Sequence, residues 1–435
     1  PINPNTEVIM QAESLVKAYV LTHGVRFTPE ALLHARQVNA KRQNVVCNIP
    51  ADDSLGKCSK PGSNSISLVP AMDHLSRPQE LFLSGEDGYK VCVSAVSPVP
   101  GREPAIVHVR NKCLCLDTPL LRWAGETLAK VEFVPQPAYY QRRTRSGRDV
   151  KRWVSACGYD EMNIWPWHDC AISRPCSFCG INTVQKKAGR DVDLLHALEL
   201  RHKPDAERTW QTTREAVLAE ITEAVELAID DECYRDEIHL IIISGNFADK
   251  QLDLQARVYS DIAYAITSRH PDRFTEGAVA VTAPPRDLGL LRMMQEAGVA
   301  VGVFNLEAYG AAAFAKHCPG KDRIGRDHYI TTLNRGVQVF GWGKSWCNFV
   351  LGLEATEDLL AGCEYLASQG VTPGANVLHR DHGARVIQEP PDIDIVVRFY
   401  RKLASIYHQH GHRPYYCQLA LRTSLANEAF AGRLD

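Results

Sequence analysis

The feature that most constrains the fold is a regular alternation of apolar runs and helical segments that begins near residue 236. Residues 237–245 (EIHLIIISG) form an apolar, β-branched run that is typical of a buried parallel strand. Further runs of this kind lie at 277–285, 299–306, 346–353 and 375–379, and residues 153–165 add one more. Segments with helical periodicity separate them. Six strand–helix units predict a parallel α/β sheet, either doubly wound or curled into a partial barrel.

The first 150 residues follow a different pattern. They contain short alternating runs interrupted by proline, glycine and aspartate, which indicates an α+β segment with antiparallel pairing. The basic stretch 141–152 (QRRTRSGRDVKR) suits a solvated linker. We therefore expect an α+β accessory domain over 1–150, the parallel sheet over 151–412 and a C-terminal tail over 413–435.

The composition argues against several classes of protein. Of the 435 residues, 45% are hydrophobic and 23% are charged, which suits a large core and not a disordered chain. Lys and Arg total 49 and Asp and Glu total 51, so the net charge of −2 argues against nucleic-acid binding as the main role. No apolar run reaches about 18–20 residues, and the N-terminus lacks the basic and apolar regions of a signal peptide. We therefore expect a cytoplasmic protein without a membrane role.

Three of the fourteen cysteines are spaced like a set of metal ligands. Cys170, Cys176 and Cys179 lie in one short segment, with five residues between the first two and two between the last two. Three thiolates on one loop can hold three corners of a cubane iron–sulfur cluster and leave the fourth iron open to a small molecule. Zinc is the alternative, with His168 as a fourth ligand, although no second ligand pair follows at the usual spacing. The other cysteines are scattered and are interpreted as buried, reduced thiols.

This segment resembles the motif of the radical S-adenosylmethionine (radical SAM) enzymes. An aromatic residue precedes the last cysteine in Cys176-Ser177-Phe178-Cys179, and β/α units follow the motif. Most members have three residues between the first two cysteines. The five found here are similar to a minority that includes the biotin-synthase-related radical SAM proteins of iron–guanylylpyridinol cofactor assembly. The resemblance implies a partial (β/α)6 TIM-like barrel, preceded by the smaller α+β domain, with a [4Fe–4S] cluster on the three cysteines.

The resemblance also implies residues that bind S-adenosylmethionine (SAM) at the carboxyl ends of the strands. They are Phe178, Gly245, Asn246, Asn305, Glu307, Gly352 and Glu354. The turn at Gly245 matches the one beside the methionyl amino group of SAM, although the usual acidic residue is absent. Asn305 and Glu307 match an Asn-x-acid pattern for the ribose and the methionine carboxylate. The Gly352 turn and an aromatic side chain flank adenine.

The implied activity is [4Fe–4S]-dependent cleavage of SAM to a 5′-deoxyadenosyl radical, which removes hydrogen from a small-molecule substrate of a biosynthetic pathway. It requires an electron donor such as flavodoxin or ferredoxin, and a cap over the barrel, for which the N-terminal domain and the 413–435 tail are candidates. His379, Arg380 and His382 follow the last strand and are either substrate contacts or part of a surface loop. The alternatives are a zinc-stabilised α/β binding module and a non-redox barrel enzyme with incidental cysteines.

Overall fold

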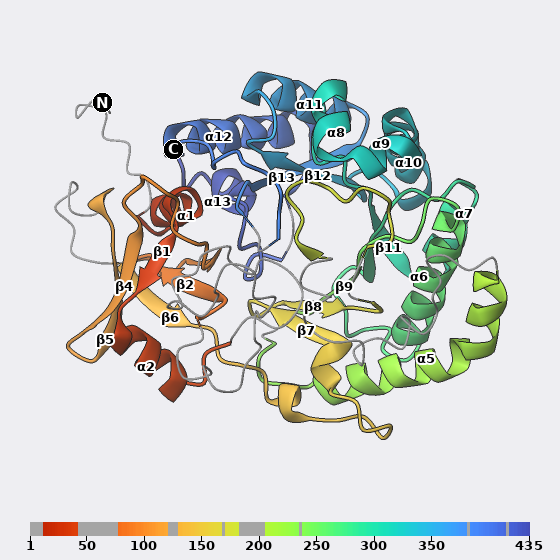
Figure 1. The fold of residues 1–435 in the computed structure, drawn as a ribbon, viewed down its shortest axis with the longest axis horizontal. Helices are drawn as coiled ribbons and strands as arrows, with labels where there is room; N and C mark the ends of the chain where they lie inside the picture. Colours follow the sequence, from red (N-terminus) through yellow and green to blue (C-terminus); the bar gives the residue numbers. More distant parts are fainter. Residues whose placement is uncertain are drawn as a thin grey trace.

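The protein contains two β-sheets, one in the N-terminal third of the chain and one in the remainder (Figure 1). The computed structural model describes residues 12–41, 77–120, 129–167, 170–181, 205–234, 237–380, 383–414 and 417–435. Within these residues, no helix combines the length and the apolar composition that crossing a membrane requires.

The larger sheet has seven strands in the spatial order β13-β12-β11-β10-β9-β8-β7, and β8 to β13 are parallel. Its strands are β7 (Val154–Cys157), β8 (Glu161–Ile164), β9 (His239–Ile243), β10 (Ala278–Val281), β11 (Val299–Val303), β12 (Ser345–Leu351) and β13 (Val371–Val377). Each parallel strand lies beside its predecessor in the chain, without the reversal of order that defines a doubly wound sheet. The sheet therefore curls into part of a barrel with its helices outside (Figure 1), which confirms the predicted partial (β/α)6 barrel.

The parallel strands are buried on both faces, and their sequences explain this. Ile241, Val279 and Val301 pack together inside the barrel, whereas Leu240 and Ile242 belong to the core under the outer helices. Continuous apolar runs are therefore required, as the sequence pattern indicates. The helices of this part are α5 (Ala206–Ala228), α6 (Leu252–Thr267), α7 (Leu290–Glu296), α8 (Ala311–His317), α9 (Pro319–Ile324), α10 (Arg326–Phe340), α11 (Thr356–Ser368), α12 (Ile393–His410) and α13 (Ala426–Phe430).

The single strand expected at 153–165 is instead a hairpin. β7 and β8 pair antiparallel, with Cys157 opposite Glu161. Gly158 allows the turn, because its φ is +52° and a Cβ atom there would lie 1.5 Å from the carbonyl oxygen of Leu419. The hairpin therefore starts the parallel sheet with β8 and presents its turn to the C-terminal part of the chain.

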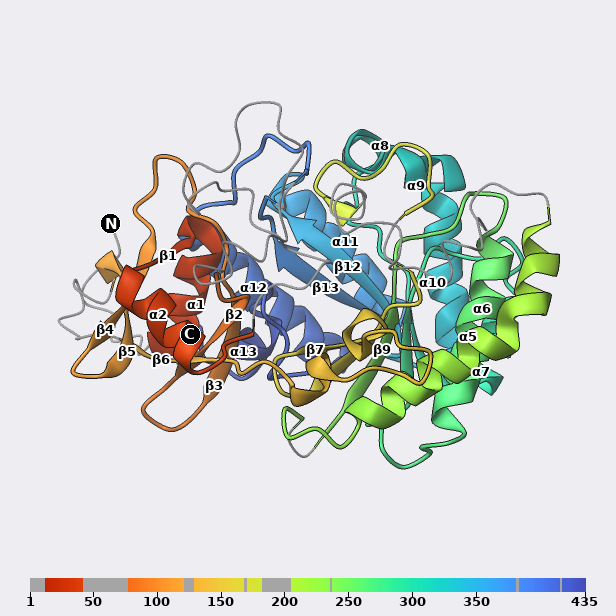
Figure 2. The same cartoon turned by 60° about the horizontal axis from the view of Figure 1, so that its bottom comes forward.

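The smaller sheet confirms the predicted α+β character of the N-terminal region. Its strands are β1 (Val25–Phe27), β2 (Glu80–Ser84), β3 (Lys90–Ser94), β4 (Ala105–Arg110), β5 (Cys113–Asp117) and β6 (Ala129–Phe133), and its helices are α1 (Ala12–His23) and α2 (Pro29–Gln37). The spatial order is β1-β4-β5-β6-β2-β3, and every pair is antiparallel except β1 with β4. Figure 2 shows α12 and α13 between this sheet and the barrel. The domain limits at 150 and 412 stay predictions, because one apolar core includes residues of both parts.

Residues 417–424, which we call the C-terminal strap, lie across the open side of the partial barrel. The amide of Val377, at the end of β13, donates to the carbonyl of Thr423 at 2.9 Å. The amide of Ser94, in β3, donates to the carbonyl of Arg422 at 3.0 Å. The strap therefore joins the edge of the barrel to the smaller sheet, and in Figure 1 this part of the chain runs between the two.

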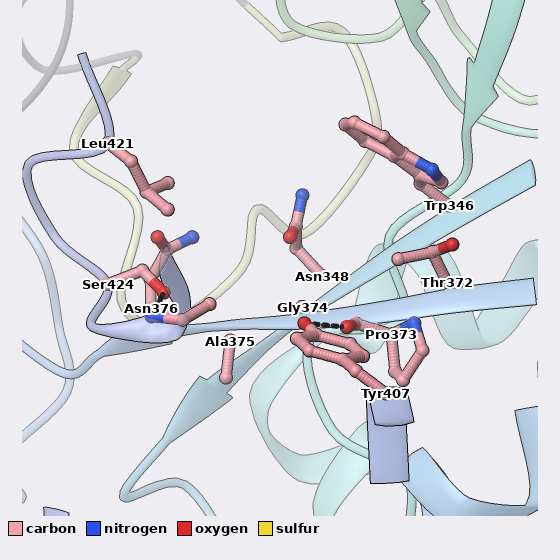
Figure 3. A pocket seen from close by; sticks show the side chains of 11 residues that line it. Trp346, Asn348, Thr372, Pro373, Gly374, Ala375, Asn376, Tyr407, Leu421 and Ser424 are labelled. Carbon is pink, nitrogen blue, oxygen red and sulfur yellow. Dashed lines mark hydrogen bonds between the residues drawn. The ribbon is translucent and has the colours of Figure 1, made fainter. Parts of the chain in front are cut away.

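Side chains of the strap fill part of the barrel interior. Cys417 and Ala420 pack against inward-facing strand residues such as Ile241. Figure 3 shows Leu421 beside Asn376 of β13. The inner wall of the barrel is therefore completed by residues far along the chain from most of its strands.

Asp160 makes the attachment of the strap dependent on pH. Its Oδ2 accepts a hydrogen bond from the amide of Leu419 at 2.8 Å, and burial raises the pKa of Asp160 from 3.8 to about 8. Because the folded-state pKa lies above the unfolded one, this group stabilises the fold fully below about pH 4, and the contribution is lost as the pH rises through about 8. We expect Asp160→Asn to flatten the pH dependence of the free energy of unfolding across this window. Urea unfolding at several pH values measures it, and an unchanged slope in the variant would contradict the assignment.

Candidate functional site

The cysteine loop, residues 170–179, follows β8 and lies at the carboxyl end of the parallel strands. On one side, the amide of Ser177 donates to the carbonyl of His317 at 2.8 Å. On another, the amides of Arg385 and Val386 donate to the carbonyl of Ser177 at 2.6 and 2.9 Å. The loop is therefore fixed between the end of α8 and the segment after β13.

Helix α9 also packs closely against the loop. A Cβ atom on Gly320 would lie 2.1 Å from Cγ2 of Ile172 and 2.5 Å from the carbonyl oxygen of Ser173, so this approach requires glycine. Arg323 of the same helix donates to Oγ of Ser173 at 2.5 Å. This packing brings Lys321, the residue after the glycine, to the cysteine loop.

The structure places the three predicted cluster cysteines on one half-buried loop and a fourth thiol beside them. Sγ of Cys170 accepts a hydrogen bond from the amide of Asn246 at 3.4 Å, and burial raises the pKa of Cys170. The buried thiol of Cys318 hydrogen-bonds to Cys176, and this bond lowers the pKa of Cys176 against the effect of burial. The spacing pattern did not identify Cys318, because it lies far along the chain on the segment between α8 and α9.

The arrangement of ligands bears on the choice between one metal ion and a cluster. Across the described ranges, no three His, Cys, Asp or Glu side chains gather closely enough to hold a single ion. His168, the fourth ligand in the zinc alternative, lies outside the described residues. Cys170, Cys176 and Cys179 supply three soft thiol donors from one fixed loop, which is the donor type that iron–sulfur clusters take.

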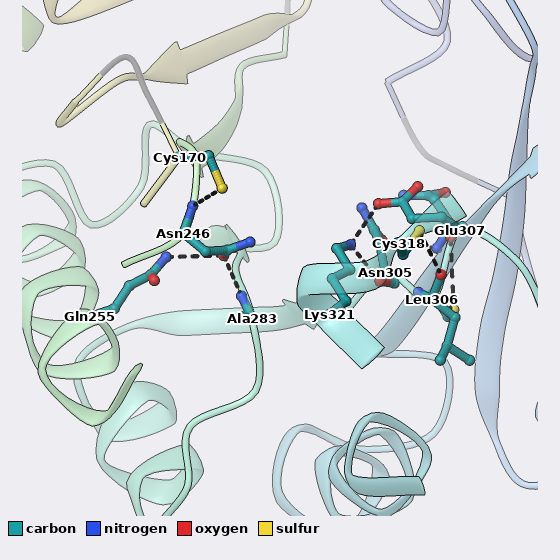
Figure 4. Close-up of polar contacts among 11 residues, drawn as sticks. Cys170, Asn246, Gln255, Ala283, Asn305, Leu306, Glu307, Cys318 and Lys321 are labelled. Carbon is teal, nitrogen blue, oxygen red and sulfur yellow. Dashed lines mark hydrogen bonds and ion pairs between the residues drawn. The ribbon is translucent and has the colours of Figure 1, made fainter. Parts of the chain in front are cut away.

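A buried ion pair lies beside the loop (Figure 4). Nζ of Lys321 donates to Oε1 of Glu307 and to the carbonyl of Asn305, both at 2.7 Å, and the lysine side chain is 9% exposed. Burial acts to lower the pKa of Lys321, but Glu307 and Tyr329 raise it well above its ordinary value. Lys321 therefore remains a cation. The sequence pattern identified Asn305 and Glu307 but missed this lysine, which sits on a short helix that the pattern did not predict.

Asn305 and Glu307 are held in place by strand β12. Oδ1 of Asn305 accepts from the amide of Asn348 at 2.9 Å. The amide of Glu307 donates to the carbonyl of Asn348 at 3.1 Å, and the amide of Val350 donates to the carbonyl of Glu307 at 2.8 Å. These bonds hold Glu307 at a φ of +69°, a costly backbone conformation for a residue with a side chain, of the kind that occurs at functional sites.

The turn after β9 brings Gly245 and Asn246 to the cysteine loop. The carbonyl of Gly245 accepts from Nε1 of Trp167 at 2.6 Å, and the carbonyl of Asn246 accepts from the amide of Ala171 at 2.7 Å. Oδ1 of Asn246 accepts from the amide of Ala283 at 2.7 Å (Figure 4). Asn246 thereby connects the β9 turn to the loop and to the segment after β10.

Gly352 and Glu354 shape the turn after β12. Gly352 has a φ of +115°, and a Cβ atom there would lie 3.0 Å from Cδ of Pro391. The two carboxylate oxygens of Glu354 accept hydrogen bonds from the amides of Tyr309 and Gly310, at 2.6 and 2.8 Å. Burial raises the pKa of Glu354 despite these bonds. Glu354 therefore joins the turn to the segment after Glu307.

A cavity of about 320 Å³ runs from the cysteine loop into the barrel. At the carboxyl end of the strands its wall contains Phe178 and Cys179 from the loop, and Asn305, Glu307 and His379 from the strand ends. The rest of the wall comes from inward-facing strand side chains and from strap residues 420–423. Its volume lies in the usual range for small-ligand sites. The other predicted cofactor residues are not among the described residues that line the cavity: Gly245 and Asn246 of the β9 turn, and Gly352 and Glu354 of the β12 turn.

The structure separates the three candidate substrate residues. His379 lines the cavity, and its Nδ1 lies 3.0 Å from the carbonyl of Val377. Arg380 is ion-paired with Glu389 and donates to the carbonyl of Ile387 at 2.9 Å, so it belongs to the loop after β13. His382 lies outside the described residues.

The Lys321–Glu307 pair provides a test of this geometry. Lys321→Met leaves a largely buried carboxylate without its partner, so we expect the free energy of unfolding to fall by about 3–5 kcal/mol. The matched control is Lys344→Met. Lys344 pairs with Glu276 at 3.8 Å with side chains 44% and 48% exposed, and its loss should cost about 0–1 kcal/mol. Urea unfolding compares them, and equal losses would show that the pair at the site is not buried as described.

The comparisons with known proteins concern the fold. The sequence matches no protein-family model, and no curated protein sequence matches it significantly. Among solved structures it is similar to HydG, a maturase of the [FeFe]-hydrogenase, at 12% identity and a TM-score of 0.39, over 60% of this chain and 52% of that one. It is similar to methylornithine synthase (PylB) at 11% identity and a TM-score of 0.35, over 62% of this chain and 72% of that one.

A third similar structure is a radical SAM methyltransferase from Sphaerobacter thermophilus. It has 11% identity and a TM-score of 0.36, over 80% of this chain and 77% of the other. The chain spans about half the length of HydG. Likenesses of this strength carry no argument about function, which must come from the site itself.

Proposed function

We propose that this chain is a radical SAM enzyme that acts on a small-molecule substrate. The observation that supports this most is the continuity of one cavity. It begins at Phe178 and Cys179 on the cysteine loop, passes Asn305 and Glu307, and ends inside the barrel. A reduced [4Fe–4S] cluster with bound SAM supplies a 5′-deoxyadenosyl radical that removes hydrogen from a substrate. A cofactor on the loop and a substrate in the barrel would then share one enclosed space.

In this proposal the cysteine loop holds the cluster through Cys170, Cys176 and Cys179. Hydrogen bonds from its backbone to α8 and to the segment after β13 fix the loop in place. Lys321 places a buried positive charge near the thiolates, and the thiol of Cys318 adds a hydrogen bond. Both groups favour the deprotonated cysteines that iron requires.

Asn305 and Glu307 are proposed to bind the ribose and methionyl part of SAM. Among the described residues, Lys321 pairs with only one oxygen of Glu307, so the other remains an acceptor on the cavity wall. Phe178 would lie against adenine. The β9 turn, with Gly245 and Asn246, and the β12 turn, with Gly352 and Glu354, would contribute mainly through their backbone, because their described side-chain bonds serve the turns themselves.

The proposed chemistry needs a cavity without bulk water, since a carbon radical would react with solvent-borne partners. The barrel interior is lined by apolar side chains such as Trp165, Ile241, Ile243 and Val281. The strap closes its open side through the bonds to β13 and β3. We therefore propose that the tail, held by the N-terminal sheet, acts as the cap.

The reaction also requires a one-electron donor, and we propose a carrier such as flavodoxin or ferredoxin. Arg174 of the cysteine loop, Lys316 of α8 and Arg385 of the segment after β13 are exposed, and Ile387 of that last segment has 84% of its surface exposed. Exposed cations and an exposed apolar side chain on these segments suit a small acidic protein, because opposite charges steer association.

The proposal is tested by the fate of SAM. The full chain is loaded anaerobically with iron and sulfide, reduced with dithionite and mixed with SAM, and the nucleosides are separated by chromatography. We expect slow formation of 5′-deoxyadenosine even without substrate, because cleavage needs only cluster, electron and SAM. Cys179→Ala should reduce the product to the level of heat-treated protein and lower the bound iron.

The matched control is Cys113→Ala, which removes an exposed thiol on β5 in the smaller sheet. This variant should retain iron and product at the level of the unchanged protein. Iron-loaded, reduced protein that forms no 5′-deoxyadenosine would contradict the radical assignment. Methylthioadenosine as the main product would show that a different C–S bond is cut. Colourless protein with zinc on the three cysteines would support the binding-module alternative.

A further inference from the structure

The strap places an arginine at the far end of the cavity from the cysteine loop. Arg422 lines the cavity, and its side chain is 11% exposed. Its Nη1 donates to Oε2 of Glu80 at 3.0 Å. Oε1 of Glu80 accepts from Nζ of Lys41 at 2.7 Å and from the amide of Gly158 at 3.0 Å. Glu80 comes from β2, so the smaller sheet reaches the barrel through this contact.

These three side chains carry an unbalanced charge. Lys41 and Glu80 are 1% and 0% exposed, so water hardly reaches them. Burial acts to lower the pKa of Lys41, but the negative charge of Glu80 raises it above its ordinary value. Burial acts to raise the pKa of Glu80, but the positive charges of Lys41 and Arg422 lower it below its ordinary value. All three are therefore ionised, and two cations share one carboxylate. A buried net charge of this kind is costly unless an anion compensates for it.

Within the part of the chain that the structure describes, Glu80 is the one carboxylate that forms an ion pair with Lys41 or Arg422. Glu161 faces the same cavity, and burial raises the pKa of Glu161 although the hydrogen bond from Asn163 and the charge of Arg422 act to lower it. One of its oxygens accepts from Nδ2 of Asn163 at 2.7 Å. Within the described residues, the bond to Glu80 is the one side-chain hydrogen bond of Arg422. A guanidinium has five N–H donors in one plane, so an edge remains for a ligand.

The surroundings favour a carboxylate over a phosphate. One planar guanidinium edge matches the two oxygens of a carboxylate. A phosphate brings a second charge and further oxygens, whereas Arg422 is the one Lys or Arg among the described residues of the cavity wall. Its neighbours include neutral groups such as Asn376, whose Oδ1 accepts from Oγ1 of Thr423 at 2.8 Å. Figure 3 shows Asn376 and Asn348 on adjacent strands of this wall. Their amides can bind neutral polar groups of the same ligand.

We propose that Arg422, held by Glu80 and Lys41, binds a carboxylate of the substrate, which is therefore a small organic acid. The assignment of this acid as the substrate rests on the proposed function. The presence of an anion site at Arg422 does not depend on that function. Arg422 would fix one end of the ligand on the strap and leave its remainder extending along the cavity toward Asn305 and Glu307. The N-terminal region thereby gains a role, because Glu80 of β2 and Lys41 of the segment after α2 position the arginine.

The test is thermal unfolding of the full chain, without added iron or SAM, at constant ionic strength. The probes are acetate, glycolate and succinate, each compared with its amide, and inorganic phosphate. We expect the carboxylates to raise the unfolding midpoint and the amides to have no effect, because ligands that bind the folded state stabilise it. In Arg422→Gln the dissociation constant for the carboxylates should rise at least about tenfold, as expected for the loss of charge-assisted hydrogen bonds.

Two further variants keep the test decisive. Arg422→Lys retains the charge next to Glu80 but loses the planar edge, so it should fold and bind the carboxylates more weakly. Arg433→Gln is the matched control, because Arg433 is also 11% exposed and ion-paired, with Glu13 and Asp87, and does not line the cavity. This control should lower the midpoint without ligand and leave the carboxylate effect intact.

Several results would overturn the inference. They are an undiminished carboxylate effect in both Arg422 variants, stabilisation by phosphate alone, or no difference between the acids and their amides. Carboxylate binding without any formation of 5′-deoxyadenosine would leave the anion site standing and remove the radical function. Formation of 5′-deoxyadenosine without carboxylate binding would support the radical function and contradict the assignment of a small organic acid as its substrate.

Discussion

A partial barrel leaves the inner face of its sheet open on one side, and apolar strand side chains are unstable in contact with water there. The rest of this structure depends on how that side is closed. The strap pairs with β13 through Val377, and its Cys417 and Ala420 pack inside the barrel. Helix α1 reinforces the attachment, because Nζ of Lys17 donates to Glu428 at 2.6 Å in a pair that is almost fully buried. The two ends of the described chain therefore meet where the barrel would otherwise be open.

Closure also determines the electrostatics of the cavity, since charges interact strongly where water is excluded. The end near the cysteine loop carries a balanced pair, Lys321 with Glu307. The end at the strap carries Arg422 and Lys41 around the single carboxylate of Glu80. The first arrangement suits a zwitterionic cofactor, and the second leaves a positive charge for a ligand. One enclosed space thus has two chemically different ends.

Much of the fold follows from local sequence pattern. The strands β9 to β13 are apolar, β-branched runs, and the helices between them repeat every 3.6 residues, so both signals lie within short windows. The hairpin at β7 and β8 was missed, because the left-handed Gly158 sits inside what reads as one continuous strand. Strand order was open between two topologies until the spatial arrangement distinguished them.

The site could be predicted only where its residues share a local motif. Cys170, Cys176 and Cys179 lie on one loop, and the cysteine spacing identified them. Lys321 was missed because it sits on a short helix that the sequence pattern did not predict, and Arg422 was missed because its partner is distant in the chain. Arg422 lies 342 residues from Glu80, and no sequence period links them. Their roles come from tertiary packing, which a single sequence does not encode in any readable pattern.

The central claim is that three cysteines hold a [4Fe–4S] cluster whose fourth iron is open to SAM. Mössbauer spectroscopy of the full chain loaded with ⁵⁷Fe measures this most directly, with and without SAM and before any reduction. We predict that SAM changes the signal of one iron of the four and leaves the other three unchanged, because only one iron lacks a thiolate. A spectrum that SAM does not alter at any iron would contradict the account, and would indicate that another group, such as Cys318 or His168, closes the cluster.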